Sequence, residues 1–438
     1  MKKNARMAAL TALERCARDG AWSAAALDAV LRDFALEPRD ASLAARLFLG
    51  VLQNDSYLDH YIDLFCHSKT EPRLRQILRL GAYQLLFLDK IPPHAAVSET
   101  VELCRNVKLD RAASLVNAVL RRLADNRDSL PPVPGQGSAA YLAVRYSHPL
   151  WLTNRLIAQQ GYSFTESFFS ANNEAACLCI QVNRLAVSPE MYERALERQG
   201  IEFKRFETLP GCLELPGGKV TDLPGFEDGL FYVQDRAARI AVEAAGVCEG
   251  MRILDACAAP GGKSFAAAVA AQGHCRITSC DLHDKKLRLI QSGAKRLGIS
   301  ECIETVPADA HIYNPAWERA FDLVLADVPC SGLGVIRKRP EIRRKVEEEL
   351  SALPEIQAAI LDNLSRYVKP GGVLLYSTCT VLEEENRQQV MRFLSNHTDY
   401  SAEDFACGDL RSKDGSYAFW PHIDGTDGFF AAKLRRIT

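Results

Sequence analysis

The first third of the chain has the spacing of apolar residues that is typical of amphipathic helices. Apolar side chains recur at intervals of three and four residues within residues 9–31, 41–52, 74–88 and 96–124. Start signals agree with this pattern, because a pair of prolines at 92 and 93 interrupts the chain before the last of these stretches. We therefore predict an all-helical domain over residues 1–130.

A different pattern follows a segment rich in proline and glycine. Residues 130–137 read Leu-Pro-Pro-Val-Pro-Gly-Gln-Gly, a composition that predicts a linker. Beyond it, some stretches have the apolar spacing of helices and others the alternation of strands. This mixture predicts a small α+β domain over residues 138–228. Its helices are predicted at residues 149–160 and 188–200, and its strands at 175–182, 201–206 and 212–215.

From residue 229 to the end, short apolar runs alternate with helical stretches. Such an alternation predicts an α/β domain with a parallel sheet covered on both faces. In sheets of this kind the ligand site lies at the carboxyl ends of the strands. The strands are predicted at residues 251–257, 275–282, 302–309, 321–328 and 371–379, and the helices at 263–271, 285–298, 355–368 and 384–394.

Composition narrows the class of protein. The 438 residues are 47% hydrophobic and 25% charged, as in ordinary globular domains, and no run approaches the roughly 18 apolar residues of a membrane span. Charged residues interrupt the first 20 positions, so we expect no signal peptide, no membrane contact and a cytoplasmic protein. The net charge of −2 gives no overall signal for nucleic acid. The 14 cysteines lack the paired spacing of zinc sites, so we expect reduced thiols and no metal.

A turn rich in small residues joins the first predicted strand to its helix. It runs through residues 253–264 and lacks the G-x-G-x-x-G fingerprint, and Cys257 occupies the place of the first glycine in a phosphate loop. Asp281, Asp309 and Asp327 end the next three strands. This arrangement suits a cofactor with a ribose, an adenine and an amino-acid tail, such as S-adenosylmethionine. The alternative is that these aspartates only cap turns and helices.

Two cysteines follow strand ends on the predicted ligand side. Cys330 comes three residues after Asp327, and Cys379 ends the last predicted strand. A single cysteine in a sheet is most often a small buried hydrophobe. In a methyl-donor domain, however, a thiolate that adds to carbon 6 of a pyrimidine makes carbon 5 able to attack a methyl group. A dithiol redox pair is the competing hypothesis, but the C-x-x-C spacing is absent.

Taken together, these motifs resemble a known family. DACAAPGGKS, ADVPCSGLGVIRKRPEIR and YSTCTVLEEEN occur here in the order found in the bacterial 16S rRNA cytosine-5 methyltransferase B family of the Nop2/Sun group. VQDRAA and DGFFAAKL are similar to it as well, and PHAAVSETVEL with ASLVNAVLRRL resembles its NusB-like RNA-binding domain. The resemblance implies a Rossmann-like S-adenosylmethionine-dependent methyltransferase domain at residues 229–438, preceded by the α+β and all-α domains.

The resemblance also implies roles for individual residues. Cys379 would be the nucleophile, Cys330 would assist product release, and Asp327 would lie between cofactor and base. Asp281 would hold the ribose and Asp309 would lie beside the adenine. The methionine end of S-adenosylmethionine would be lined by Cys257, Ala258, Ala259, Pro260, Gly261, Gly262 and Lys263. The implied partner is 16S rRNA, and we expect a monomer.

A basic segment follows Cys330 directly. Residues 337–345 contain six basic residues and one acid, and we predict that Arg337, Lys338 and Arg339 contact RNA phosphates. The alternative is a solvated helix face, since three glutamates follow at 347–349. Two other functions remain open at this point: the same chemistry on tRNA or another RNA, and a non-catalytic RNA-binding assembly factor.

Overall fold

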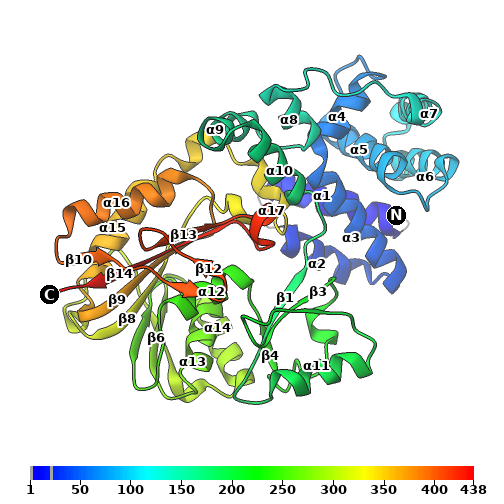
Figure 1. The fold of residues 1–438 in the computed structure, drawn as a ribbon. Coiled ribbons are helices and arrows are strands. Elements are labelled where there is room, and N and C mark those ends of the chain that lie inside the picture. Colours follow the sequence, from blue (N-terminus) through cyan, green and yellow to red (C-terminus); the bar gives the residue numbers. More distant parts are fainter. Residues whose placement is uncertain (1–2, 20–22) are drawn as a thin grey trace. The chain divides into compact units, whose positions relative to one another are not determined.

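The computed structural model describes residues 3–19 and 23–438, so residues 20–22 of the predicted stretch 9–31 lie outside the described residues. Two compact units make up the chain, and Figure 1 shows the helices and strands that belong to each. We name them the helical unit (Met1–Glu174 and Ile336–Glu347) and the sheet unit (Ala175–Val335 and Glu348–Thr438). The domain limits at residues 130, 138 and 228 stay a prediction.

The helical unit is built on one continuous apolar core. Leu13, Phe48, Leu78 and Leu120 are fully buried in it. Proline occupies the first turn of α3, α5 and α6, where its missing N–H has no helical partner to lose. The helices are α1 (Ala5–Asp19), α2 (Ser23–Phe34), α3 (Pro38–Gln53), α4 (Asp55–Asp63), α5 (Pro72–Phe87), α6 (Pro93–Asn106), α7 (Ala113–Asp125), α8 (Ala139–Arg145), α9 (Leu150–Gln160) and α10 (Tyr162–Asn172).

The helical periodicity in the first 125 residues and at 149–160 is confirmed, but α10 was missed. Its sequence, YSFTESFFSAN, is rich in serine and aromatic residues, which have weak helical propensity and favour no helix in isolation. Packing decides the matter, because Phe168 and Phe169 are fully buried. Tertiary burial therefore overrides a sequence that is locally indifferent.

A segment that is distant in sequence completes the helical unit. We name Ile336–Glu347 the anchor segment; it contains a short 3₁₀ turn at Pro340–Arg344. Arg343 on this turn is 5% exposed, and burial lowers its pKa to about 9. Its guanidinium donates hydrogen bonds to neutral acceptors at the C-terminal ends of α3, α8 and α10: the carbonyl oxygens of Gln53 (2.6 Å), Tyr146 (2.9 Å), Ser147 (3.2 Å) and Asn172 (3.2 Å), and Oδ1 of Asn173 (2.5 Å).

These acceptors explain why an arginine is buried there. The last carbonyls of a helix have no partner within the helix, and they form the negative end of its dipole. One guanidinium satisfies such carbonyls from three helices at once. Trp151 on α9 adds a hydrogen bond to the Lys345 carbonyl at 3.1 Å, and Arg344 lies 3.8 Å from Asp55. The anchor segment is thus bound to the helical unit at several points.

The sheet unit begins with a small antiparallel sheet in the order β2-β3-β1-β4. α11 (Pro189–Arg198) packs on it through the buried side chains of Tyr192 and Leu196. The predicted strand at 201–206 is only two residues long. β4 was missed, because three apolar residues beside a glycine carry too little pattern. The strands are β1 (Leu178–Val182), β2 (Lys204–Arg205), β3 (Cys212–Leu215) and β4 (Phe231–Val233).

The second sheet of this unit has eight strands and contains all five strands predicted after residue 229. Its central strands run parallel in the order β9-β8-β5-β6-β7. The predicted parallel sheet is confirmed, and the C-terminal strand β14, which was not predicted, extends it by running antiparallel beside β9 and pairing antiparallel with β10 and β13. The strands are β5 (Arg252–Asp255), β6 (Arg276–Asp281), β7 (Ile303–Pro307), β8 (Phe321–Asp327), β9 (Val368–Thr378), β10 (Tyr400–Ala402), β13 (Ser416–Phe419) and β14 (Phe429–Arg436). A separate two-stranded ribbon pairs β11 (Ala406–Cys407) with β12 (Leu410–Arg411).

Helices cover both faces of the larger sheet, as Figure 1 shows. Because side chains alternate along a strand, Ile253 enters the core beneath one group of helices and Leu254 the core beneath the other. α12 (Arg236–Ala244), α13 (Gly262–Ala270) and α14 (Asp284–Leu297) pack on the first face, and α15 (Leu353–Ser365) and α16 (Arg387–Asn396) on the second. A one-turn helix, α17 (Pro421–Asp424), precedes β14. The predicted α/β class is confirmed.

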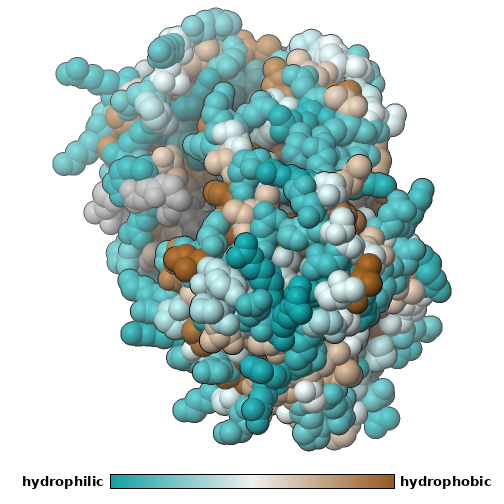
Figure 2. All heavy atoms as spheres, turned by 90° about the vertical axis from the view of Figure 1, so that its left-hand side faces the viewer, coloured by the Kyte–Doolittle hydropathy of each residue, from teal (hydrophilic) through white to brown (hydrophobic). Residues whose placement is uncertain are grey.

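Hydrophilic side chains cover most of the face drawn in Figure 2, and apolar atoms are scattered over it. Single exposed apolar residues, such as Met391 and Leu289, are normal on a protein surface. Within residues 3–19 and 23–438, the structure contains no helix long and apolar enough to cross a membrane.

Candidate functional site

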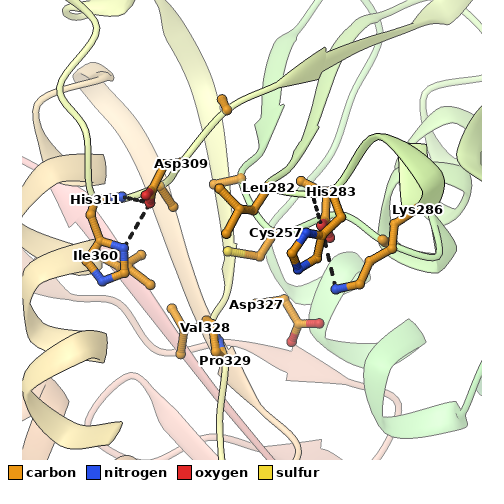
Figure 3. A pocket seen from close by; sticks show the side chains of 15 residues that line it. Cys257, Leu282, His283, Lys286, Asp309, His311, Asp327, Val328, Pro329 and Ile360 are labelled. Carbon is orange, nitrogen blue, oxygen red and sulfur yellow. Dashed lines mark hydrogen bonds and ion pairs between the residues drawn. The ribbon is translucent and has the colours of Figure 1, made fainter. Parts of the chain in front are cut away.

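The carboxyl ends of β5, β6, β7 and β8 surround a cavity of about 410 Å³ (Figure 3). Five of the residues predicted from sequence line it: Cys257, Ala259, Asp281, Asp309 and Asp327. The other predicted residues do not line this cavity: Ala258, Pro260 and Gly261 lie in the adjoining turn, and Gly262 and Lys263 begin α13. Four strand ends that are distant in sequence therefore meet at one site, as the topology of a doubly wound sheet requires.

The turn between β5 and α13 is fixed from beneath by a buried carboxylate. Gly261, the residue before α13, has φ of 112°, a conformation that strongly favours glycine. Asp255 at the end of β5 is fully buried and accepts a hydrogen bond from the Ser264 hydroxyl at 2.6 Å. Ser264 Oγ also lies 2.8 Å from Ser279 Oγ on β6. Burial raises the pKa of Asp255 to about 6.

Asp281 and Asp309 both line the cavity and stabilise the turns that follow them. Oδ1 of Asp281 accepts the His283 backbone N–H at 3.1 Å, and Oδ1 of Asp309 accepts the His311 backbone N–H at 2.9 Å. The Nδ1 atom of His311 lies a further 2.9 Å from Asp309 Oδ1. These hydrogen bonds lower the pKa of Asp309. Oδ1 of each aspartate therefore caps a turn, as the alternative hypothesis predicted. No hydrogen bond from a described residue reaches Oδ2 of either side chain.

Asp327 lies at the end of β8 and is held on both oxygens. Oδ1 accepts a hydrogen bond from Ser377 Oγ at 2.8 Å, and Oδ2 lies 2.7 Å from Lys263 Nζ. The Lys263 ammonium is also 5.1 Å from the centre of the Phe429 ring, and its side chain is only 10% exposed. The structure thus brings the end of the glycine-rich turn to Asp327, a pairing that the sequence did not predict.

The two cysteines predicted to carry chemistry lie side by side. Sγ of Cys330 is 3.2 Å from Sγ of Cys379, and the Cys379 backbone N–H points at Cys330 Sγ at 3.3 Å. Neither lines the cavity, but Pro329, which precedes Cys330, does. The hydrogen bond to Cys379 and burial raise the pKa of the Cys330 thiol well above its usual value. Both effects favour the protonated form of the Cys330 thiol.

A close backbone crossing holds the segment that contains Cys330. We name residues 328–335 the Cys330 loop and residues 378–382 the Cys379 loop. The Gly334 N–H donates to the Cys379 carbonyl at 2.9 Å, and the Gly428 N–H donates to the Gly334 carbonyl at 2.9 Å. A Cβ atom on Gly334 would lie 1.9 Å from the Gly428 carbonyl oxygen, so only glycine fits there.

Several residues of the cavity were not predicted. His283, Lys286, His311 and Ile360 all line it, and Figure 3 shows the His311 ring beside the Asp309 carboxylate. A signal for the histidines exists in the sequence, because each follows a strand-end aspartate by two residues. Ile360 carried no such signal, since it comes from α15 and reaches the site only through packing.

The predicted RNA-binding residues belong to the anchor segment of the helical unit. Arg337 and Lys338 are partly exposed and Arg339 is exposed, whereas Arg343 in the same basic stretch is buried among helix ends. RNA contact by Arg337, Lys338 and Arg339 stays a prediction. Among the residues that the structure describes, no group of three or more histidine, cysteine, aspartate or glutamate side chains is arranged to hold a metal ion.

The cavity suits a ligand that combines hydroxyl groups with a flat apolar ring. Oxygens of Asp281 and Asp309 that face no donor are suited to accept hydrogen bonds from a ribose or an amine. Leu282, Val328 and Ile360 supply apolar wall between them. These residues fit the ribose and adenine of S-adenosylmethionine, the cofactor expected from the sequence.

Comparisons with known proteins agree along the whole chain. Three family descriptions match consecutive parts: the NusB family at residues 3–125, a ferredoxin-like domain of RsmF/B-like methyltransferases at 148–221, and 16S rRNA methyltransferase RsmB/F at 246–435. The probable ribosomal RNA small subunit methyltransferase B of Bacillus subtilis is 32% identical over 99% of both chains. The ribosomal RNA small subunit methyltransferase B of Citrobacter koseri is also 32% identical over 99% of both. A crystal structure of the protein PH0851 superposes with a TM-score of 0.83 at 26% identity, covering 100% of this chain and 99% of that one.

Proposed function

Because this chain belongs to the RsmB/F family of 16S rRNA methyltransferases, we propose that it methylates carbon 5 of one cytosine in 16S rRNA through a covalent adduct on Cys379. S-adenosylmethionine, the cofactor of this family, supplies the methyl group. The observation that carries the proposal is the 3.2 Å separation of two thiols at the ends of neighbouring strands, beside the cavity that fits this cofactor.

The chemistry explains why two thiols are needed. Carbon 5 of cytosine is a poor nucleophile until a thiolate adds to carbon 6. After methyl transfer, the carbon-5 proton must leave and the bond between carbon 6 and sulfur must break, which regenerates the thiolate. We assign the addition to Cys379 and assistance with release to Cys330. The raised pKa of Cys330 supports this division, because the neighbouring sulfur is then the one that becomes the nucleophile.

We propose that Asp327 contacts the target base at N3 and the exocyclic amine. Lys263 at 2.7 Å and the Ser377 hydroxyl at 2.8 Å hold its carboxylate in one orientation. Asp281 would hold the ribose of the cofactor, Asp309 would lie beside the adenine, and residues 257–263 would line the methionine end. A fixed carboxylate beside the ring positions the base without reorganisation at the moment of reaction.

The helical unit would supply RNA binding, as its match to the NusB family suggests. The target cytosine must leave its stack to reach a thiol, so a loop or bulge is the expected substrate. Arg337, Lys338 and Arg339 would contact phosphates at the start of the anchor segment. We propose that the protein acts as a monomer in the cytoplasm.

The proposal is tested by incubating the purified protein with unmethylated 16S rRNA and methyl-labelled S-adenosylmethionine. Mass spectrometry of the digested RNA should find label in 5-methylcytosine at one position. Label that appears only with tRNA would move the substrate to tRNA and keep the chemistry. Binding of the cofactor with no label in either RNA would favour a non-catalytic assembly factor.

Variants of the two thiols test their roles separately. Cys379→Ser should abolish labelling, whereas Cys330→Ala should accumulate a covalent protein–RNA adduct, seen as a shifted band under denaturing conditions. Cys248→Ala is the matched control, because Cys248 is exposed in the same unit and should change neither result. Labelling at the wild-type rate by Cys379→Ser would contradict the assignment of the nucleophile.

A further inference from the structure

A buried glutamate lies behind the two thiols and is not used by the mechanism above. Glu385 ends a short 3₁₀ turn at Glu383–Glu385, after the Cys379 loop, and is only 2% exposed. Its carboxylate forms no ion pair with any described residue. A buried carboxylate is stable only where hydrogen bonds replace its lost water. The identity of its donors therefore shows what it holds.

All three donors to Glu385 are neutral, and two of them come directly after the thiols. Oε2 accepts the Ser331 backbone N–H at 2.8 Å, and Ser331 follows Cys330. Oε1 accepts the Thr380 hydroxyl at 3.1 Å, and Thr380 follows Cys379. The Ser331 and Thr380 hydroxyl oxygens are themselves 2.6 Å apart. One carboxylate thus connects the Cys330 loop to the Cys379 loop.

The third donor extends the connection to the residue before Cys330. The Gln357 side chain on α15 donates to Glu385 Oε2 at 2.8 Å and to the Pro329 carbonyl at 3.0 Å. Cys330 is therefore held on both sides, through Pro329 and through Ser331. The Tyr376 hydroxyl fixes the Glu385 backbone by donating to its carbonyl at 2.6 Å.

The residue after Glu385 holds Cys379 in the same way. The Thr378 hydroxyl donates to Asn386 Oδ1 at 2.5 Å, and Asn386 Nδ2 donates to the Thr380 carbonyl at 3.1 Å. Every residue adjacent in sequence to either thiol is thus hydrogen-bonded to Glu385, Asn386 or Gln357. No bond in this network involves the thiols themselves, and only the bond from Gln357 to Pro329 reaches the wall of the cofactor cavity.

We propose that Glu385 is a positioning residue that holds Cys330 and Cys379 at the separation needed for addition and release. The inference rests on the proposed function and deepens it, since it names what keeps the two thiols in register. A displacement of about 1 Å from a productive geometry can cost on the order of 10²-fold in rate. Loss of Glu385 should therefore lower the turnover number while leaving cofactor affinity unchanged.

The test compares three substitutions at one site. Glu385→Ala removes the connection, and its kcat for RNA methylation should fall about 10²-fold, with the Kd for S-adenosylmethionine within twofold of wild type. Glu385→Gln keeps it: the amide oxygen can accept from Ser331 and Gln357, and the amide NH₂ can donate to Thr380. Its kcat should stay within about fivefold of wild type. A Glu385→Gln enzyme as slow as Glu385→Ala would overturn a positioning role.

A second measurement reports thiol geometry without RNA. Diamide oxidises two adjacent thiols to a disulfide and is itself reduced to a hydrazine, and peptide mapping can follow the bond between Cys330 and Cys379. Closure should be about tenfold slower in Glu385→Ala and unchanged in Glu383→Gln, the matched control on the same turn. If wild-type protein methylates no cytosine, the proposed function fails, and this comparison still decides whether Glu385 positions the thiols.

Thr380→Val keeps the test decisive if Glu385→Ala does not fold, which loss of cofactor binding would reveal. Valine matches threonine in shape and removes only the hydroxyl that donates to Glu385. We expect kcat and the rate of disulfide closure to fall about tenfold. Turnover and closure both within twofold of wild type, in a variant that binds cofactor normally, would show that the connection does not position the thiols.

Discussion

The helical unit and the sheet unit each bury a charged side chain among neutral partners. In the helical unit, Arg343 donates to four backbone carbonyls and one amide oxygen. In the sheet unit, Glu385 accepts from one backbone N–H, one amide and one hydroxyl. Neither forms an ion pair with a described residue. Each connects parts of the chain that are far apart in sequence.

The two groups differ in what they hold. The acceptors of Arg343 lie at the ends of three helices, where the last carbonyls have no donor within their own helix. The donors to Glu385 lie next to two thiols whose separation matters for chemistry. The same device thus stabilises the fold in one unit and, as we propose, sets reaction geometry in the other. The role of a buried charge is therefore identified from its hydrogen-bond partners, because burial alone does not distinguish the two roles.

The largest effect should come from removing the guanidinium. Arg343→Met should destabilise the helical unit by at least about 3 kcal/mol, because each buried acceptor left without a donor costs roughly 1–3 kcal/mol. Hydrogen exchange of amides in α3, α8 and α10 should show the loss as faster local opening. Arg344→Met is the control: Arg344 is exposed and 3.8 Å from Asp55, so its loss should cost under about 1 kcal/mol. An equal loss of stability in Arg343→Met and Arg344→Met would show that the buried guanidinium does not stabilise the fold.

Asp255 provides a pH test of the sheet unit. Its pKa is raised from 3.8 to about 6, so the folded protein holds a proton that the unfolded chain releases. Stability should therefore fall as the pH rises from about 4 to about 6, by about 3 kcal/mol in total at 1.36 kcal/mol per pKa unit. Asp255→Asn should remove this slope. Urea unfolding of wild type and variant at pH 4 and pH 7 measures the free energy of unfolding. Between pH 4 and pH 7, the stability of the variant relative to wild type should rise by about 3 kcal/mol. The same pH dependence in both proteins would contradict the prediction.

His148 should give the helical unit the opposite slope. Its ring is buried, stacks 3.8 Å from the Phe169 ring and lies near Arg343, and its pKa is lowered well below 6.5 by burial and by that positive charge. The unfolded chain then binds a proton first, so stability is lost as the pH falls below about 6.5, by up to about 1.4 kcal/mol per pH unit. Amide exchange in α9 and α10 between pH 5 and pH 7 should show the slope in wild type and not in His148→Gln. A slope that survives the substitution belongs to another group.

The smallest effect should come from Arg339 in the anchor segment. Arg339→Ala should weaken RNA binding less than tenfold, with a fall of about 1 in the salt dependence of the binding constant. Titration of labelled 16S rRNA fragments at several salt concentrations measures both. Arg392→Ala, on α16 and paired with Glu355, is the control. An unchanged salt dependence would remove Arg339 from the RNA-binding surface.

Sequence reasoning reached the fold class and most of the cavity because both depend on local patterns. Apolar runs, helical spacing and the aspartates at strand ends were enough to predict Asp281, Asp309 and Asp327 at one sheet edge. The antiparallel strand β14 was not predicted, because three of its eight residues are basic and interrupt the apolar pattern. α10 was not predicted, because tertiary burial, rather than local helical propensity, makes it a helix.

Interactions between positions that are distant in sequence could not be predicted. The pairing of Lys263 with Asp327 and the connection through Glu385 join residues from different loops, and no spacing rule relates them. Arg343 shows the opposite failure, because it stood in a basic stretch that suggested a solvent-facing surface. Its burial follows from three helix ends that converge on it, which only the assembled fold reveals.

The anchor segment also sets an order of events during synthesis. Domains generally form as units while the chain leaves the ribosome, beginning with the N-terminal one. Here the helical unit includes residues up to Glu347 of 438. Its helix ends are therefore without the Arg343 guanidinium until most of the parallel strands of the sheet unit have been synthesised. A nascent chain interrupted before that point carries a helical unit with open acceptors, a state that chaperones and proteases recognise. The segment thus links the completion of the first unit to the synthesis of β5 to β8 of the second.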